Sequence, residues 1–251
     1  MSHQIYALIV LALFSVSVVA NPLDALKEPL RSQQQIASHA ERFSQWANQA
    51  RGWRFKLLTE SEREALEDFS ISGYKVTNDY LRLSGSADWG STASSAKEFV
   101  NKVKSGMRKL PRYKGIAYRG SWIKQSLMDK LRVGDVVVEP AFTSTTVIPE
   151  VAKRFAIVRP QTTAPIQRVW LAVDIKKQGK VLAGLSEFSR EGEVLLPPNT
   201  YFRVTHIENF HKTSLIAVET VTADKAMHED IYNLFTGEKV KPSFWQAYIC
   251  G

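Results

Sequence analysis

The spacing of apolar residues changes near Pro111, and this change constrains the fold more than any other feature of the chain. From Asn21 to Arg112, apolar residues recur at the intervals of three and four that amphipathic helices require. After that point, short runs rich in β-branched and aromatic residues predict strands. Helices followed by strands indicate an α+β fold, and we expect the sheet to carry the functional residues.

The helical part contains one clear start signal. Thr59 and Glu62 have the spacing of a capping box, in which Thr59 caps the helix and Glu62 reaches back to the cap. This helix is expected to run through Phe69 and to be broken at Ser72-Gly73. Other helices are expected over residues 38–46, 74–83 and 96–110, the last with Phe99, Val100 and Val103 on its apolar face.

The second part of the chain is expected to be mostly strands. Between two of them, Pro149 opens a short helix that runs to Val158. The tail from Ala223 onward is expected to pack a short helix against the body. The expected strands cover residues 115–120, 136–138, 142–146, 168–175, 193–196, 201–207 and 214–220.

Residues 1–20 differ from the rest. Ile5 to Ala20 is almost wholly apolar, and Val18-Val19-Ala20 supplies the small residues of a signal-peptidase site, so we expect cleavage before Asn21 and secretion. Because the first four residues carry no Lys or Arg, a membrane anchor is the alternative, although about sixteen apolar residues are few for a bilayer span. No later stretch could span a membrane. The expected organisation is a signal peptide (1–20) and one domain (21–251), with a helical part (21–112), a sheet core (113–222) and a tail (223–251).

Composition limits the classes of partner. The net charge of +8 favours an acidic partner, but the Lys and Arg residues are spread along the chain, so nucleic acid is not expected. Cys250 is the only cysteine and leaves no internal disulfide, so the fold must depend on its core. The five histidines are scattered without the spacing of a metal-ligand pair, and no metal is expected. We expect a monomer.

Two carboxylates stand at the start of an apolar run. Glu191 and Glu193 are two residues apart and precede Val194-Leu195-Leu196, which predicts a buried strand. Since alternate residues of a strand face the same side, both acids should point the same way. Paired carboxylates suit a reaction that develops positive charge or removes a proton. The alternative is two surface glutamates at the end of a strand.

Three segments together resemble a known family. Tyr118-Arg119-Gly120, Phe142-Thr143-Ser144-Thr145-Thr146 and Glu191-Gly192-Glu193 resemble the Arg, Ser-Thr-Ser and Glu-x-Glu signature of arginine-specific mono-ADP-ribosyltransferase toxins of the iota and exoenzyme-S types. Thr146 stands where the family has Ser, which keeps a hydroxyl. The resemblance covers residues 113–220 and the helical layout before them. It implies an α+β fold in which two roughly perpendicular, mostly antiparallel sheets surround an NAD cleft.

The resemblance also implies roles for single residues. Arg119 would hold the NAD phosphates, for which a guanidinium fork is suited, and Gly120 would let the backbone approach the nicotinamide amide. Ser144 would orient Glu193, the catalytic carboxylate that stabilises the cation formed as nicotinamide leaves. Glu191 would orient the incoming arginine and help to remove its proton.

Further residues are implied near the ends of these motifs. Phe155 would pack against the nicotinamide ring, with core packing as the alternative. Arg154 or Arg159 would supply a second phosphate contact. Phe188 would be the aromatic residue of the loop that recognises the substrate.

The resemblance therefore predicts a secreted mono-ADP-ribosyltransferase toxin, acting in virulence. It would move ADP-ribose from NAD to an arginine of a host protein, release nicotinamide and also hydrolyse NAD. The resemblance implies arginine specificity because position 191 is a glutamate and not a glutamine. Two other functions remain open: an NAD glycohydrolase that passes ADP-ribose only to water, and a secreted basic module that binds an acidic surface without catalysis.

Overall fold

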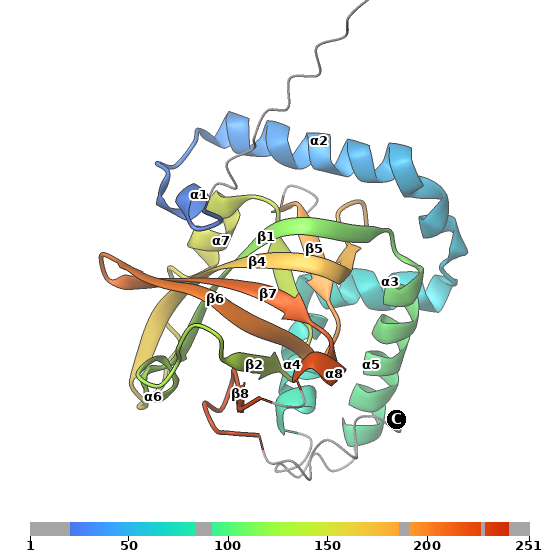
Figure 1. Ribbon diagram of the computed structural model, residues 1–251. Helices are drawn as coiled ribbons and strands as arrows, with labels where there is room; N and C mark the ends of the chain where they lie inside the picture. The colour runs from blue at the N-terminus through green and yellow to red at the C-terminus, as the bar shows by residue number, and fades with distance from the viewer. Residues whose placement is uncertain (1–20, 84–91, 186–190, 227–228, 241–251) are drawn as a thin grey trace, which may run out of the picture.

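The structure is a computed structural model that describes residues 21–83, 92–185, 191–226 and 229–240 (Figure 1). The expected signal peptide, the loop residue Phe188 and the last eleven residues of the tail, 241–251, lie outside the described residues. Helices precede strands along the chain, so the predicted α+β class is confirmed. Within the described ranges, no helix is both long enough and apolar enough to cross a membrane.

Capping boxes begin two of the helices in the N-terminal part. Ser32 and Gln35 form one at the start of α2, and Thr59 and Glu62 form the predicted one at the start of α3. In the second, the Glu62 backbone N–H donates to Thr59 Oγ1 and the Thr59 N–H donates to the Glu62 carboxylate. The helices of this part are α1 (Asp24–Lys27), α2 (Gln33–Arg51), α3 (Glu60–Asp68), α4 (Tyr74–Leu83) and α5 (Thr92–Lys109), with a 3₁₀ turn at Gly52–Leu57.

The predicted break at Ser72-Gly73 is wrong. A π-helical turn, η2 (Phe69–Gly73), joins α3 directly to α4. A Cβ atom on Gly73 would lie 2.8 Å from the ring of Phe99 on α5, so the glycine permits close packing and does not end the helix. Because π-turns occur often at functional sites, this segment is of interest for the site described below.

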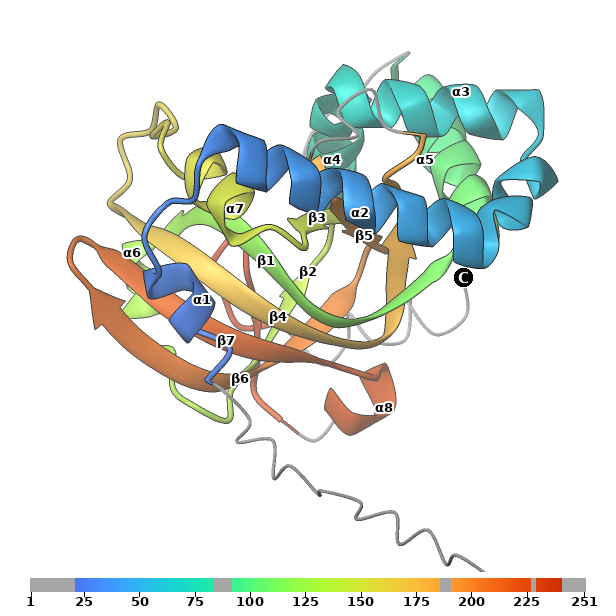
Figure 2. The ribbon, with the colours of Figure 1, turned by 90° about the horizontal axis from the view of Figure 1, so that it is seen from above.

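α2 lies across the upper edge of the sheet. Its apolar stripe consists of the buried Ile36, Ala40 and Ala47 and the partly buried Phe43, which recur at helical intervals. Figure 1 shows α2 above α7 and β1, and the view from above in Figure 2 shows it crossing both. Ile36 and Ala40 pack against Ile148 and Val151 at the start of α7 (Pro149–Phe155), so α2 touches the short helix predicted after Pro149.

Eight strands form a mostly antiparallel sheet, and only the pairs β4–β7 and β2–β8 are parallel among those described. The hydrogen-bonded order is β1-β3-β5-β4-β7-β6-β2-β8. Short helices α6 (Gln125–Met128) and α8 (Ala223–Ala226) connect strands. The strands are β1 (Arg112–Lys124), β2 (Val136–Glu139), β3 (Thr143–Thr146), β4 (Ile166–Val181), β5 (Glu193–Leu196), β6 (Thr200–Phe210), β7 (Thr213–Val221) and β8 (Ile231–Asn233).

Hydrogen bonds link all eight strands into one sheet, whereas the resemblance implied two. β1 pairs with β4 along most of its length and also with β3, at Tyr118 and Thr146. β5 pairs with β3 and with the end of β4. In the β3–β5 register, Thr146 is opposite Glu193 and Ser144 is opposite Leu195. These pairings bring the three sequence motifs to one edge of the sheet.

Two apolar clusters hold this arrangement. One lies within the folded sheet and includes Ala117, Val194 and Leu196. The other lies where α3, η2 and α5 cover the sheet, and includes Phe69, Phe142 and the predicted apolar residues of α5. Phe69 and Phe142 meet edge to face, with ring centroids 5.1 Å apart. The helical part thus packs directly behind the strand that carries Ser144.

Candidate active site

A cleft of about 890 Å³ lies between the helical part and the sheet. Its lining includes η2 and α4 on one side, β1 and β3 at its base, and α7 with the segment after it on the other side. Arg119, Gly120, Ser144, Glu191 and Glu193 all line it, so the structure brings the three predicted motifs together. The volume lies within the range of pockets that enclose a ligand the size of a cofactor.

Arg119 connects the first motif to the second. Its Nη1 donates a 2.8 Å hydrogen bond to the backbone carbonyl oxygen of Ser144. Burial lowers the pKa of the Arg119 guanidinium, and the negative charges of Glu139 and Glu193 oppose that change. The side chain stays partly exposed to the cleft. The guanidinium is therefore fixed on one side and keeps donors for a ligand.

Glu193 is the most strongly perturbed carboxylate of the cleft. It begins β5 and is 8% exposed. Burial raises its pKa to about 7, and the nearby charge of Glu191 adds to the rise. A hydrogen bond with the Ser144 side chain and the positive charge of Arg119 act in the opposite direction. Such a group, close to half ionised at neutral pH and buried in a cleft, is a candidate for catalysis.

The strand period predicted that Glu191 lies on the same strand as Glu193, but the structure places it outside that strand. β5 begins only at Glu193, and Gly192 has the left-handed φ of +58°, so Glu191 lies in a turn before the strand. Thr146 Oγ1 donates a hydrogen bond to the backbone carbonyl oxygen of Glu191, and the Val147 N–H donates to that of Gly192 at 3.1 Å. Both acids line the cleft, and burial raises the pKa of Glu191 as well.

Gly120 has a packing role that the sequence did not indicate. A Cβ atom at this position would lie 1.9 Å from the carbonyl oxygen of Ala152 on α7. Any other residue at position 120 would therefore displace α7 from β1. Ala152 and Gly120 both line the cleft, so the position of α7 sets its width at this point.

The structure places the secondary candidates in different surroundings. Phe155 ends α7, is 59% exposed and lines the cleft, so it is not the core residue of the alternative interpretation. The Arg159 guanidinium lies 6.0 Å from the ring centroid of Trp122. Neither Arg159 nor the exposed Arg154 lines the cleft. Phe188 lies outside the described residues.

Sequence reasoning missed the contribution of α4. Tyr74, Asn78 and Arg82 all line the cleft. They follow one another at intervals of four, which puts them on one face of a helix, and that polar stripe was the available signal. Arg82 binds Glu139 in a forked pair, with Nε–Oε1 at 3.1 Å and Nη2–Oε2 at 3.2 Å. The cleft therefore contains a second guanidinium, supplied by the helical part.

The described residues suit a phosphate-bearing ligand. Among them, no group of three His, Cys, Asp or Glu side chains could hold a metal. Arg119 lines the cleft and keeps donors that match phosphate oxygens, whereas the fork of the second guanidinium, Arg82, is bound to Glu139. The aromatic side chains of Tyr74, Trp122 and Phe155 offer surfaces for flat rings. These features fit NAD, which carries two phosphates and two flat bases.

Comparisons with known proteins point to one family. The model of the ADP-ribosyltransferase exoenzyme family matches residues 40–225. The chain is 47% identical to the ADP-ribosyltransferase Vis of Vibrio splendidus (strain 12B01), over 97% of this chain and 98% of Vis. It is 28% identical to the NAD(+)–protein-arginine ADP-ribosyltransferase Tre1 of Serratia proteamaculans (strain 568), over 64% of this chain and 32% of Tre1. It thus spans nearly all of Vis and about a third of Tre1.

Crystal structures of Vis share the fold. The structure of Vis with an M6 inhibitor gives a TM-score of 0.84 at 48% identity, covering 88% of this chain and all of the Vis chain. The structure of Vis with agmatine gives 0.81 at 46% identity, over 87% of this chain and 99% of the other. The predicted ADP-ribosyltransferase fold is confirmed by these matches and by the order of helices and strands. The chain belongs to the ADP-ribosyltransferase exoenzyme family.

Proposed function

We propose that this protein is a secreted toxin that transfers one ADP-ribose from NAD to an arginine of a host protein. The observation that carries the proposal is the pairing of two carboxylates with different environments in one cleft. Glu193 is buried beside Arg119 and Ser144, whereas Glu191 lies half-buried in the turn before β5. One acid is suited to act on the sugar, and the other to act on an acceptor that arrives from solvent.

The first half of the reaction breaks the bond between ribose C1′ and the nicotinamide nitrogen. The bonding electrons leave with nicotinamide, and the ribose develops the charge of an oxocarbenium ion, as in glycoside hydrolysis. Ionised Glu193 accepts a hydrogen bond from the ribose 2′-hydroxyl and stabilises that charge. Arg119 holds the phosphates.

The second half forms a bond from C1′ to a guanidine nitrogen. Because the pKa of an arginine side chain is above about 12, the group must lose a proton as it attacks. Glu191 is placed to orient the guanidinium and to accept that proton. Two relatives support arginine as the acceptor: Tre1 is named as a protein-arginine transferase, and Vis has been crystallised with agmatine, which carries a guanidinium. Water in place of the guanidine would give NAD hydrolysis at the same site.

Secretion rests on residues 1–20, with their apolar run and the small residues of Val18-Val19-Ala20. Expression of the full chain, followed by N-terminal sequencing of protein recovered from the medium, tests this part. A first residue of Asn21 is the expected result. Protein that keeps residues 1–20 and stays with the cell membrane would instead support the anchor.

The catalytic proposal is tested with the chain from Asn21, a fluorescent NAD analogue and agmatine as acceptor. Glu191→Gln should lose transfer to agmatine and keep much of the NAD hydrolysis, because only the acceptor step uses Glu191. Glu193→Gln should lose both. Glu98→Gln, on an exposed residue of α5, is the matched control and should keep both.

Two results would favour the other functions. If NAD is cleaved but neither agmatine nor an added arginine-rich protein becomes labelled with ADP-ribose, the protein is a glycohydrolase. Absence of cleavage by the wild type would indicate a binding module, whose affinity for an acidic partner should fall with rising salt.

A further inference from the structure

The segment before the family domain makes buried contacts with α7. The family model begins at residue 40, whereas the described chain begins at Asn21. Between them, Leu23 and Leu26 pack against β4 and β7, and the remaining residues cross to α7. We call residues 21–39 the strap.

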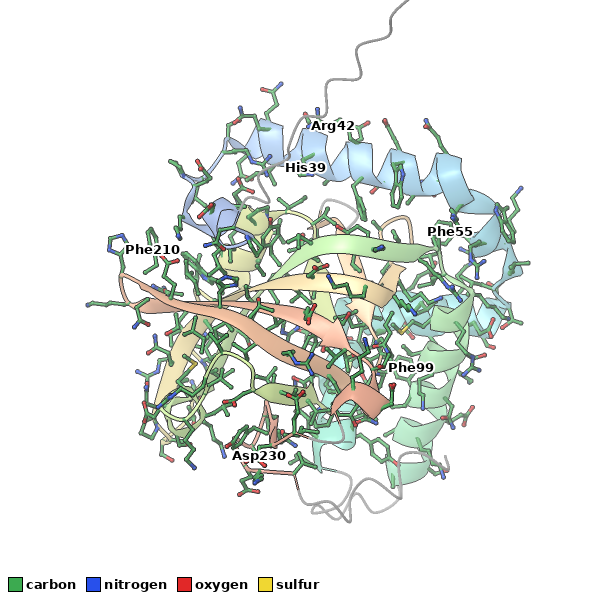
Figure 3. The ribbon with its side chains drawn as sticks, in the orientation of Figure 1. His39, Arg42, Phe55, Phe99, Phe210 and Asp230 are labelled. Carbon is green, nitrogen blue, oxygen red and sulfur yellow. The ribbon has the colours of Figure 1, made fainter. Side chains whose placement is uncertain are left out.

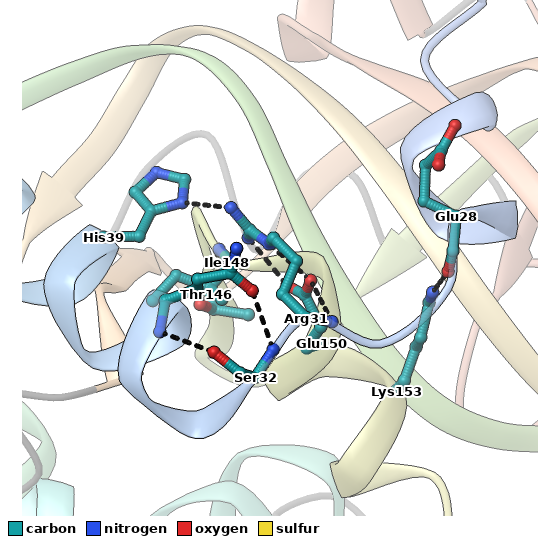
Figure 4. Close-up of polar contacts among 9 residues, drawn as sticks. Glu28, Arg31, Ser32, His39, Thr146, Ile148, Glu150 and Lys153 are labelled. Carbon is teal, nitrogen blue, oxygen red and sulfur yellow. Dashed lines mark hydrogen bonds and ion pairs between the residues drawn. The ribbon is translucent and has the colours of Figure 1, made fainter.

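Arg31 and Glu150 form the main link between the strap and α7 (Figure 4). Arg31 Nε and Nη2 donate to the two carboxylate oxygens of Glu150 at 2.6 and 2.8 Å. The backbone N–H of Arg31 also donates to Glu150, at 3.4 Å. Glu150 is 3% exposed, and the Arg31 hydrogen bonds hold its pKa down to about 2. A bidentate fork on a buried carboxylate fixes both the distance and the orientation of the two segments.

Two further contacts support the link. Lys153 Nζ donates a 2.7 Å hydrogen bond to the backbone carbonyl oxygen of Glu28 in the strap. His39 Nδ1 lies 3.3 Å from Arg31 Nη1, and since a guanidinium only donates, the ring nitrogen must accept. Figure 3 shows His39 on the side of α2 that faces the sheet, away from Arg42.

α7 depends on such contacts for its position. It has seven residues, and Ile148 gives it no side-chain cap. A helix of this length is not stable by itself in water. α7 packs closely on β1 because Gly120 has no side chain. The Ala152 carbonyl oxygen of α7 occupies the space that a Cβ atom at position 120 would need.

α7 in turn connects to the cleft at both of its ends. At the far end, Phe155 lines the cleft. At the near end, Ile148 N–H donates to Thr146 Oγ1, which itself donates to the carbonyl oxygen of Glu191. A Cβ atom on Gly192 would lie 2.9 Å from Val147 Cγ2, so this turn already touches the segment before α7.

We infer that the strap sets the position of α7 and, through it, the position of Glu191 in the cleft, with Arg31 and Glu150 as positioning residues. The inference rests on the proposed function, since Glu191 is the acceptor-side carboxylate there. Neither Arg31 nor Glu150 lines the cleft, so neither touches a substrate. Their effect on transfer is indirect, through the turn at residues 146–148.

The test compares transfer to agmatine with NAD hydrolysis in the same samples of the chain from Asn21. Arg31→Ala should lower the ratio of transfer to hydrolysis by about tenfold or more, because small misplacements of reacting groups carry large costs in rate. The ratio is the decisive measurement, since a smaller folded fraction would reduce both activities equally. Arg31→Lys, which keeps the charge but not the fork, should fall between Arg31→Ala and wild type.

Two more variants complete the design. Arg31→Ala leaves a buried carboxylate unpaired, so a variant that removes both charges, Arg31→Gln with Glu150→Gln, covers the case in which the first does not fold. It should lower the ratio in the same direction. Lys27→Ala breaks a 2.9 Å ion pair between α1 and Glu208 of β6, which ties the strap to the sheet and not to α7, and should leave the ratio unchanged.

The outcomes separate the two proposals. An active wild type whose ratio stays the same in every folded variant of Arg31 would overturn the role of the strap and leave the proposed function intact. A wild type that cleaves no NAD would overturn both. A lower ratio in the Lys27 variant as well would show that the effect does not pass through Arg31 and Glu150, and would also overturn the inference.

Discussion

The Arg119 side chain and the Ser144 backbone are joined by a hydrogen bond of 2.8 Å between Nη1 and the carbonyl oxygen. This bond fixes the guanidinium of the first motif to the strand of the second. Because this bond occupies one N–H group of the Arg119 guanidinium, its other donors remain for a ligand in the cleft. The pair explains why both motifs are needed for one binding site.

Arg119→Lys should therefore weaken NAD binding although the charge is kept. An ammonium cannot donate to Ser144 and to a phosphate with the geometry of a fork. Loss of one charged hydrogen bond costs about 1.5–3 kcal/mol, so the KM for NAD should rise by about tenfold or more. Arg112→Lys, at the exposed start of the same strand, is the control and should leave KM unchanged. A wild-type KM in Arg119→Lys would refute the assignment.

Glu193→Gln should remove NAD cleavage and make the protein more stable at pH 8. A carboxylate about 4 Å from a full positive charge contributes roughly 4 kcal/mol at an effective dielectric constant of about 20, or on the order of a thousandfold in rate. The pKa of Glu193 is raised to about 7 in the folded state, so its ionisation destabilises the fold as pH rises from about 4.5 to about 7.

The stability of this variant is measured by thermal unfolding at pH 4 and pH 8. The gain over wild type should be present at pH 8, on the order of 3 kcal/mol, and small at pH 4, where Glu193 is protonated in both states. A variant that is inactive and also less stable at pH 8 would show that the loss of activity comes from a damaged fold.

The pH dependence of NAD hydrolysis should follow the ionisation of Glu193. Since the ionised form acts, kcat/KM should rise with pH up to about 7 and then level off. Ser144→Ala removes a hydrogen bond that lowers this pKa, so the midpoint should move to higher pH. Glu191→Gln removes a negative charge that raises it, so the midpoint should move to lower pH. Equal midpoints in all three proteins would argue against Glu193 as the titrating group.

Gly120→Ala should destabilise the protein through α7. The new methyl group would lie 1.9 Å from the Ala152 carbonyl oxygen, and neither strand nor helix can yield without breaking other contacts. We expect a loss of about 3 kcal/mol, seen as a lower midpoint in urea or thermal unfolding. Gly52→Ala is the control, because its nearest neighbour would be 4.0 Å away, and a change within about 0.5 kcal/mol is expected.

Local sequence determined much of this protein. The change of period near Pro111 predicted helices before strands, and Thr59 with Glu62 predicted the start of α3, because both depend on residues close together in the chain. The order of the motifs at Arg119, Ser144 and Glu193 was enough to indicate the family and the residues that line the cleft.

Tertiary structure decided the features that join distant segments. Gly120 is required by α7, Arg82 enters the cleft from α4, and Arg31 reaches Glu150 across 119 positions of sequence. Gly120 and Arg31 have no local signal, and the polar stripe of α4 does not show by itself which surface it faces, because the free energy of each contact comes from a partner that only the fold brings near. The turn at Gly192 is a similar case. The strand period predicted that both acids face one side, but both reach the cleft through a turn in which Gly192 is left-handed, Thr146 binds the Glu191 carbonyl oxygen and Val147 binds that of Gly192.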